Sequence, residues 1–74
     1  MTAVKAIRPL DPNALSASPE DAARFLSVHR RTIDRLITDR ILKARKAGRR
    51  VLVDMASIRA YHESLPVIGE GANG

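Results

Sequence analysis

The chain reads SPEDAARFLSVHRRTIDRLITD over residues 18–39, and this stretch decides the fold. Ser18 is a good N-cap, and Pro19 suits the first helical position because its missing N–H costs nothing there. Glu20 adds negative charge at the positive end of the helix dipole. Apolar residues follow at positions 22, 23, 25 and 26. These features predict a short helix that begins at Pro19 and ends near Leu26.

A second amphipathic helix is predicted over residues 30–39, after a break of three residues. Ile33, Leu36 and Ile37 recur at the spacing of one helix face, which marks a buried stripe. His29 stands at the N-cap position of this helix. Two short amphipathic helices joined by so short a turn are typical of a helix-turn-helix.

The next stretch has the pattern of a β-hairpin. Ala47-Gly48 separates two short segments, residues 42–46 and 49–53. The second segment alternates loosely, with Val51 and Val53 on one face and Arg50 and Leu52 on the other. This pattern predicts two strands joined by a tight turn with an arginine-rich tip.

The ends of the chain differ from its middle. Asp54 is predicted to cap a last helix, whose core-facing residues would be Ile58, Tyr61 and Leu65. Residues 1–15 are predicted to form an irregular arm, with a short turn packing Leu15 on the domain. Residues 66–74 contain three glycines and are predicted to be a disordered tail. The expected folded domain is residues 16–65, mainly α with a small β-hairpin.

Basic residues are concentrated in one segment of the chain. The whole chain has 13 Lys and Arg against 8 Asp and Glu, a formal net charge of +5. From His29 to Arg50, nine basic and two acidic residues give +7, so the rest of the chain carries −2. One cationic segment on a nearly neutral scaffold indicates a polyanion binder. A merely solvated surface explains the charge less well, because a balanced scaffold is already soluble.

Several classes of function are disfavoured by the composition. There is no cysteine for a disulfide or thiolate metal site, and no apolar run approaches the roughly 20 residues of a membrane span. His29 and His62 are far apart in sequence and lack a carboxylate cluster. Tyr61 lacks the arginine and histidine constellation of a recombinase nucleophile. We therefore expect no catalytic site, metal or cofactor, no membrane partner, and a cytoplasmic location.

The order of these pieces resembles the excisionase and MerR-type winged helix-turn-helix family. The resemblance covers residues 16–65. Ser27 stands where many members have glycine, and His29 stands where serine usually caps the recognition helix. The pieces that carry the resemblance are Ser18 to Leu26, Val28 to Ile37, Gly48 to Val53, and the closing Asp54-x-x-x-Ile58-x-x-Tyr61.

The resemblance implies a winged helix-turn-helix and a non-enzymatic function. A domain of this size looks like a phage or mobile-element excisionase, which binds and bends attachment-site DNA and directs a tyrosine integrase towards excision. Such proteins often bind side by side, so self-association on DNA is expected. The close alternative is a stand-alone AlpA-like or MerR-like transcriptional regulator. A protein–protein adaptor with the same fold is an alternative of another class.

Double-stranded DNA is the expected partner. The candidate contact residues fall into three groups, which are predicted to contact bases, the minor groove and phosphates. Arginine can donate two hydrogen bonds to guanine in the major groove, which the N-terminal half of a recognition helix approaches. The base-reading candidates are Arg30, Arg31, Thr32 and Arg35, with Asp34 orienting Arg30 or Arg31 or accepting from cytosine. The wing candidates for a narrow minor groove are Arg49 and Arg50. Those for phosphate are Lys43, Arg45 and Lys46.

Overall fold

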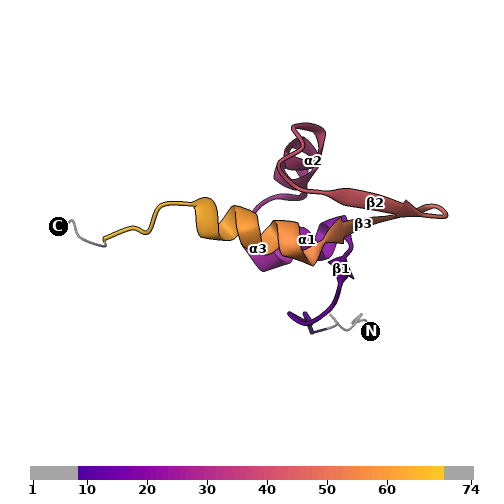
Figure 1. Ribbon diagram of the computed structural model, residues 1–74, viewed down its shortest axis with the longest axis horizontal. Coiled ribbons are helices and arrows are strands. Elements are labelled where there is room, and N and C mark those ends of the chain that lie inside the picture. The colour runs from indigo at the N-terminus through magenta and orange to yellow at the C-terminus, as the bar shows by residue number, and fades with distance from the viewer. Residues whose placement is uncertain (1–8, 70–74) are drawn as a thin grey trace, which may run out of the picture.

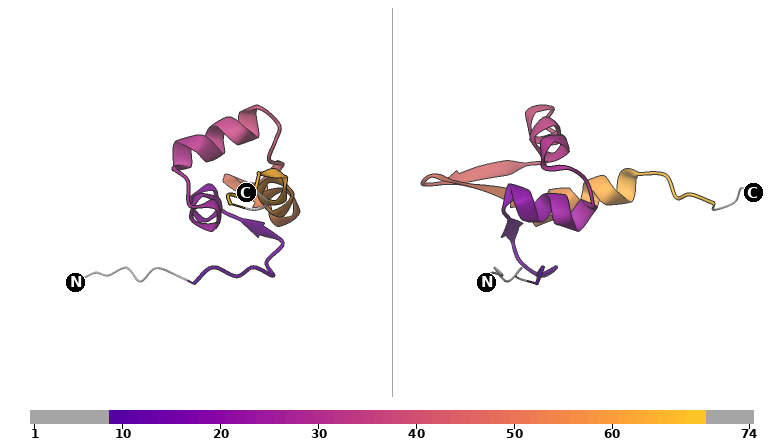
Figure 2. Two further views of the ribbon diagram at one scale, coloured as in Figure 1. Left: turned by 90° about the vertical axis from the view of Figure 1, so that its left-hand side faces the viewer. Right: turned by 180° about the vertical axis from the view of Figure 1, so that it is seen from behind.

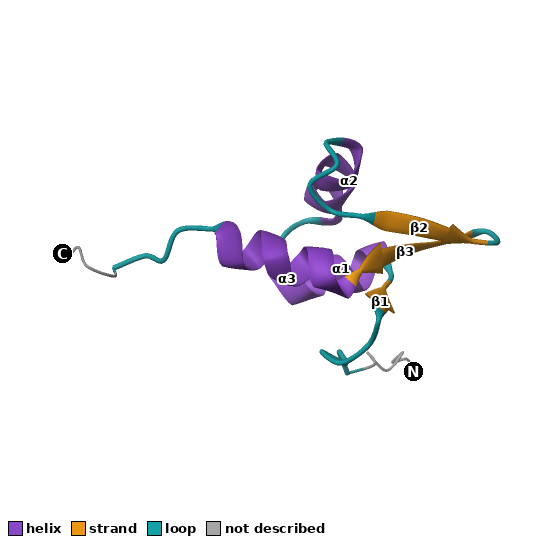
Figure 3. Ribbon diagram, viewed as in Figure 1, coloured by secondary structure: helices purple, strands orange, loops and turns teal. Residues whose placement is uncertain are grey.

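The described part of the chain, residues 9–69 of a computed structural model, forms three helices and one three-stranded antiparallel sheet (Figure 1). Figure 3 shows the hairpin of β2 and β3 projecting away from the helices. A helix-turn-helix followed by such a hairpin is a winged helix-turn-helix, as predicted. The elements in order are β1 (Ser16–Ala17), α1 (Pro19–Leu26), α2 (Arg30–Thr38), β2 (Ala44–Ala47), β3 (Arg50–Asp54) and α3 (Met55–Ser64).

The start of α1 follows the predicted cap. The Ser18 hydroxyl accepts a hydrogen bond from the backbone N–H of Asp21 at 3.0 Å, and Pro19 occupies the first turn. This bond satisfies one of the backbone N–H groups that a helix start leaves without an intrahelical acceptor. The boundaries of both α1 and α2 lie within a residue of the predicted ones.

The turn between α1 and α2 depends on Ser27. Its φ is 57° and its ψ is 42°, so a serine adopts the left-handed conformation that usually favours glycine. The Ser27 N–H donates to the carbonyl of Arg24 at 3.3 Å, and the Val28 N–H donates to that of Ala23 at 3.0 Å. These bonds close the Schellman motif that lets the chain reverse into α2. The serine thus makes the turn that glycine makes in many resembling proteins.

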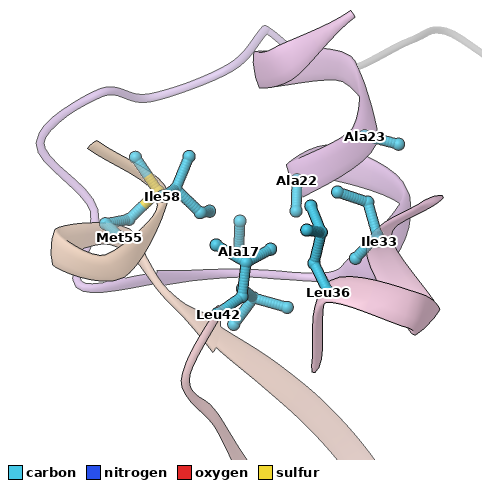
Figure 4. Packing of buried hydrophobic residues seen from close by; sticks show 9 residues of the cluster. Ala17, Ala22, Ala23, Ile33, Leu36, Leu42, Met55 and Ile58 are labelled. Atoms are coloured by element: carbon cyan, nitrogen blue, oxygen red, sulfur yellow. The ribbon is translucent and has the colours of Figure 1, made fainter. Parts of the chain in front are cut away.

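The core lies between the three helices and the base of the sheet. The left-hand view of Figure 2 shows α2 from the side while α1 and α3 are seen end-on, so α2 runs across their direction. In Figure 4, Ile33 and Leu36 of α2 lie beside Ala22 of α1. Among the described residues, ten apolar residues are buried and no polar or charged one is. The buried residues are Ala17, Pro19, Ala22, Ala23, Ile33, Leu36, Leu42, Val53, Met55 and Ile58.

The hairpin forms with its turn one residue later than predicted. Ala47 pairs with Arg50, so the two-residue turn is Gly48-Arg49 rather than Ala47-Gly48. Gly48 has a φ of +63°, and Arg49 does not share that positive φ. A glycine with positive φ at the first turn position matches a type II′ turn, whose twist suits a hairpin.

A third strand was not predicted from the sequence. β1 pairs with the base of β3, with Ala17 opposite Val53, and the Leu15 carbonyl accepts from the Met55 N–H at 3.0 Å. The predicted short turn exists, because the Ala14 N–H donates to the Asp11 carbonyl at 3.1 Å. The predicted packing of Leu15 is wrong, since this residue is 88% exposed.

The predictions for α3 are confirmed in part. Ile58 is buried and Tyr61 packs against the core, but Leu65 follows the helix end and is exposed. Asp54 occupies the N-cap position without a side-chain capping bond. Instead, the Ser57 hydroxyl donates to the Asp54 carbonyl at 2.8 Å and accepts from the Lys43 N–H at 3.1 Å. Ser57 thereby joins the start of α3 to the entry of the hairpin.

The predicted arm and tail extend beyond the residues that the structure describes. Residues 1–8 and 70–74 lie outside them, so the predicted irregular and disordered character of those stretches is not tested. Residues 66–69 have no helix or strand, and Ile68 is 98% exposed.

Replacing Ser27 by glycine should stabilise the domain. Ser27→Gly removes the penalty of a side chain in the left-handed conformation, and we expect the free energy of unfolding to rise by about 0.5–1 kcal/mol. Urea denaturation followed by circular dichroism measures this change. Ser27→Ala, which keeps the Cβ, should give no such gain. A less stable glycine variant would contradict the left-handed turn.

Candidate nucleic-acid interface

The outer face of α2 presents Arg31 and Arg35. These residues are one turn apart and therefore lie above one another on the helix, opposite the stripe that Ile33 and Leu36 bury. Both are exposed, and neither side chain forms a hydrogen bond or ion pair with any residue between 9 and 69. Thr32 is half-buried at the edge of this face. The two arginines therefore have guanidinium donors that the fold does not use.

The first turn of α2 is capped by His29. The backbone N–H of Arg31 donates to Nδ1 of His29 at 3.1 Å, which confirms the predicted N-cap. Nδ1 thus serves as the acceptor for a backbone N–H that a helix start leaves without an intrahelical partner. The cap thus stabilises the end of α2 that carries most of the base-reading candidates.

Arg30 differs from the other base-reading candidates because its side chain has intramolecular partners. Its Nε donates to Oδ1 of Asp34 at 3.1 Å, and its Nη1 donates to Oε2 of Glu20 on α1. The hydrogen bond to Asp34 is the main cause that raises the pKa of Arg30, and the charges of Asp34 and Glu20 add to it. Asp34 thus orients Arg30, one of the two arginines that the sequence suggested for it.

The hairpin carries its cations on both faces. Side chains alternate along each strand, and the register places Arg45 opposite Leu52 and Lys46 opposite Val51. Lys46 therefore lies on the face that buries Val53 at the hairpin base, while Arg45 lies on the other face. All the predicted hairpin cations are exposed, namely Lys43, Arg45, Lys46, Arg49 and Arg50.

One hairpin cation is paired within the fold. Nε of Arg45 lies 3.5 Å from Oδ1 of Asp54, whose side chain is 24% exposed. The Arg45 side chain is itself 61% exposed, so this pair is accessible to solvent and weak. The side chains of the other four hairpin cations form no hydrogen bond or ion pair with residues 9–69.

The fold brings α2 and the hairpin to one end of the molecule. In Figure 1 and in the right-hand view of Figure 2, α2 stands above the base of the hairpin, which projects sideways. Arg40 lies between them, exposed and with a positive φ of 64°. Arg40 belongs to the basic segment of the sequence, but no contact was predicted for it. Its position directly after the predicted helix 30–39 is the sequence feature that could have marked it as a contact residue.

The described residues contain neither a cluster of metal-ligating side chains nor a membrane-spanning helix. Between residues 9 and 69, no three His, Cys, Asp or Glu side chains come together as metal ligands would. None of the helices in that range has both the length and the apolar character needed to cross a bilayer.

Comparison with known proteins identifies the domain type. The family model described as a helix-turn-helix domain matches residues 18–65, from the N-cap of α1 to the residue after α3. No curated protein and no solved structure matches the chain. The matched residues include both helices of the helix-turn-helix, the hairpin and all the predicted contact residues.

Removal of the imidazole cap should weaken α2. We expect His29→Ala to lower the free energy of unfolding by about 1 kcal/mol, because the Arg31 N–H loses its acceptor. His29→Asn keeps a side-chain acceptor and should stay close to the original stability. Chemical denaturation compares the two variants, and equal stability would mean that the cap contributes nothing.

Proposed function

Since this chain belongs to the helix-turn-helix domain family, we propose that it binds duplex DNA sequence-specifically, with α2 in the major groove. The observation that carries the proposal is the pair of guanidinium groups of Arg31 and Arg35 on the outward face of α2, which have no partner among residues 9–69. The cationic hairpin beside α2 supplies a second contact region. We expect α2 to occupy the groove while the hairpin contacts its phosphate walls.

Base reading falls to the outward face of α2. Arg31 and Arg35 each have the donor geometry for guanine O6 and N7, and their spacing of one turn suits neighbouring base steps. Thr32, at the N-terminal end, is close enough to the same groove to contact a base or its methyl group.

The hairpin supplies contacts with the backbone and the minor groove. Arg49 and Arg50 lie at the turn, so in this arrangement they enter the adjacent minor groove. Lys43, Arg45 and Lys46 contact phosphates. Cations on both hairpin faces support this placement, because a strand pair between two phosphate walls meets negative charge on either side.

The salt dependence of binding tests the electrostatic part of the proposal. If about six phosphates are neutralised, the logarithm of the association constant should fall with the logarithm of salt concentration at a slope near −5. Fluorescence anisotropy with a labelled 20-bp duplex, over a range of salt, measures the slope. The duplex is selected by the protein from a random pool, and a scrambled duplex is the control.

Arg35→Ala separates base reading from phosphate binding. A base contact predicts a loss of about 1–3 kcal/mol on the selected duplex and a smaller loss on the scrambled one. Equal losses would assign Arg35 to phosphate. Absence of duplex binding in dilute buffer would contradict the proposed function and favour the adaptor hypothesis.

For the biological role, we propose that the protein is an excisionase of a phage or mobile element. The resemblance of residues 16–65 to excisionases supports this role. On this proposal, copies bind side by side on attachment-site DNA, bend it and cooperate with a tyrosine integrase in the bacterial cytoplasm. The transcriptional regulator with the same fold is the competing role.

An excision assay distinguishes the two roles. Purified protein is added to the integrase encoded nearest to its gene, with DNA that carries the recombined attachment sites. We expect the protein to increase the yield of excised circles, and Arg31→Ala/Arg35→Ala to abolish the increase. Binding to a promoter fragment without any gain in excision would support the regulator.

A further inference from the structure

Arg30 links the two helices of the helix-turn-helix. Its guanidinium donates to Glu20 in the first turn of α1 and to Asp34 one turn along α2. The other cations on α2, Arg31 and Arg35, have no such partners among the described residues. We infer that Arg30 is a positioning residue, which sets the orientation of α2 against α1 and does not read bases. This inference rests on the proposed function.

The placement of Arg30 on α2 supports this role. Arg30 lies one turn before Ile33 and two turns before Ile37, so it lies along the edge of the buried stripe. Arg31, the next residue, belongs to the outward face. A side chain at the edge of the stripe lies at the border between α1 and α2. From this border the Arg30 side chain reaches Glu20 on α1.

The charges around Arg30 are unfavourable for DNA. One arginine and two carboxylates carry a net charge of −1, so this cluster attracts phosphate less than Arg31 and Arg35 do. A move of Arg30 into the groove would leave Glu20 and Asp34 without their partner close to the phosphates. The fold thus favours keeping Arg30 on the two carboxylates.

The Arg30–Glu20 ion pair adds a polar contact to the apolar contact between α1 and α2. Ile33 and Leu36 pack against Ala22, which has no side-chain atom beyond Cβ. Ala22 contributes only a methyl group to this contact, so a polar link at its edge adds a further constraint on rotation of α2 about its axis. The ion pair from Arg30 to Glu20 lies at the edge of this contact and opposes such rotation, which would displace Arg31 and Arg35 together.

The weakness of the Arg30 ion pairs determines in which measurement their loss is detected. The side chains of Arg30, Glu20 and Asp34 are 44%, 67% and 56% exposed, and solvent screens such pairs strongly. Their loss should therefore leave the domain folded. The consequence should appear in DNA binding, where a change in the orientation of α2 alters all base contacts at once.

Glutamine variants at both ends of the bridge give the sharpest test. Charge alone predicts opposite effects, since Arg30→Gln removes a cation and weakens DNA binding, whereas Glu20→Gln removes an anion and strengthens it. Positioning predicts that both weaken binding to the selected 20-bp duplex, by about two- to fivefold. The double variant should then be no weaker than either single variant, because both disrupt one link.

Two control variants separate the possible roles. Arg24→Gln removes an arginine whose ion pair with Asp21 stays within α1, and it should weaken binding less than Arg30→Gln. Arg31→Gln should lose discrimination at one base pair by about 5- to 150-fold, as expected for a bidentate base contact. Arg30→Gln should keep the original ranking of all single base-pair changes in the duplex. Circular dichroism melting checks that each variant is folded.

Each outcome supports or overturns the role of Arg30. Tighter binding by Glu20→Gln, no effect of Arg30→Gln, or an equal loss with Arg24→Gln would overturn it. Loss of preference at a single base pair in Arg30→Gln alone would make Arg30 a base-reading residue, with the proposed function intact. A random pool that yields no preferred duplex would instead overturn the proposed function, and the positioning role with it.

Discussion

The packing of α2 against α1 is the constraint on which the other features depend. Ile33 is fully buried, and it meets Ala22, which is also fully buried. Only a small core supports the domain, and small domains have little stability to spare. The face of α2 that carries Ile33 and Leu36 must therefore point inward. Arg31 and Arg35 face outward as a consequence, because they occupy the opposite side of the same short helix.

Intramolecular pairing divides the cationic segment into two groups. Arg30 and Arg45 have carboxylate partners in Glu20, Asp34 and Asp54. Arg31 and Arg35 have no side-chain partner among the described residues. The net charge of the segment therefore overstates the charge that a polyanion would meet, and the donors that remain are concentrated on the outward face of α2 and the hairpin.

The hairpin is held at its base and extends freely beyond it. Val53 is buried, and β1 pairs with β3 only at this end. Ser57 bonds to Lys43 and Asp54, which ties the hairpin entry to α3. Towards the turn, Val51 and Arg50 lose contact with the core and become exposed. A rigid base with an exposed tip places the distal cations at a defined distance from α2.

The sequence by itself determined the elements whose signals are local. Ser18, His29 and the stripe of Ile33 and Leu36 defined α1 and α2, because capping and helical periodicity operate within a few residues. Gly48 marked a hairpin, although the turn lies one residue later than the composition suggested.

Only the tertiary structure decided the contacts between distant residues. β1 has two residues, too few for any strand pattern, and it exists because β3 offers a free edge beside it. The pairing of Arg30 with Glu20 depends on the angle at which α2 crosses α1, so the sequence alone did not predict it. Leu15 and Leu65 are exposed although both are apolar. Burial depends on which surfaces come together, and the pattern of a short terminal segment does not specify them.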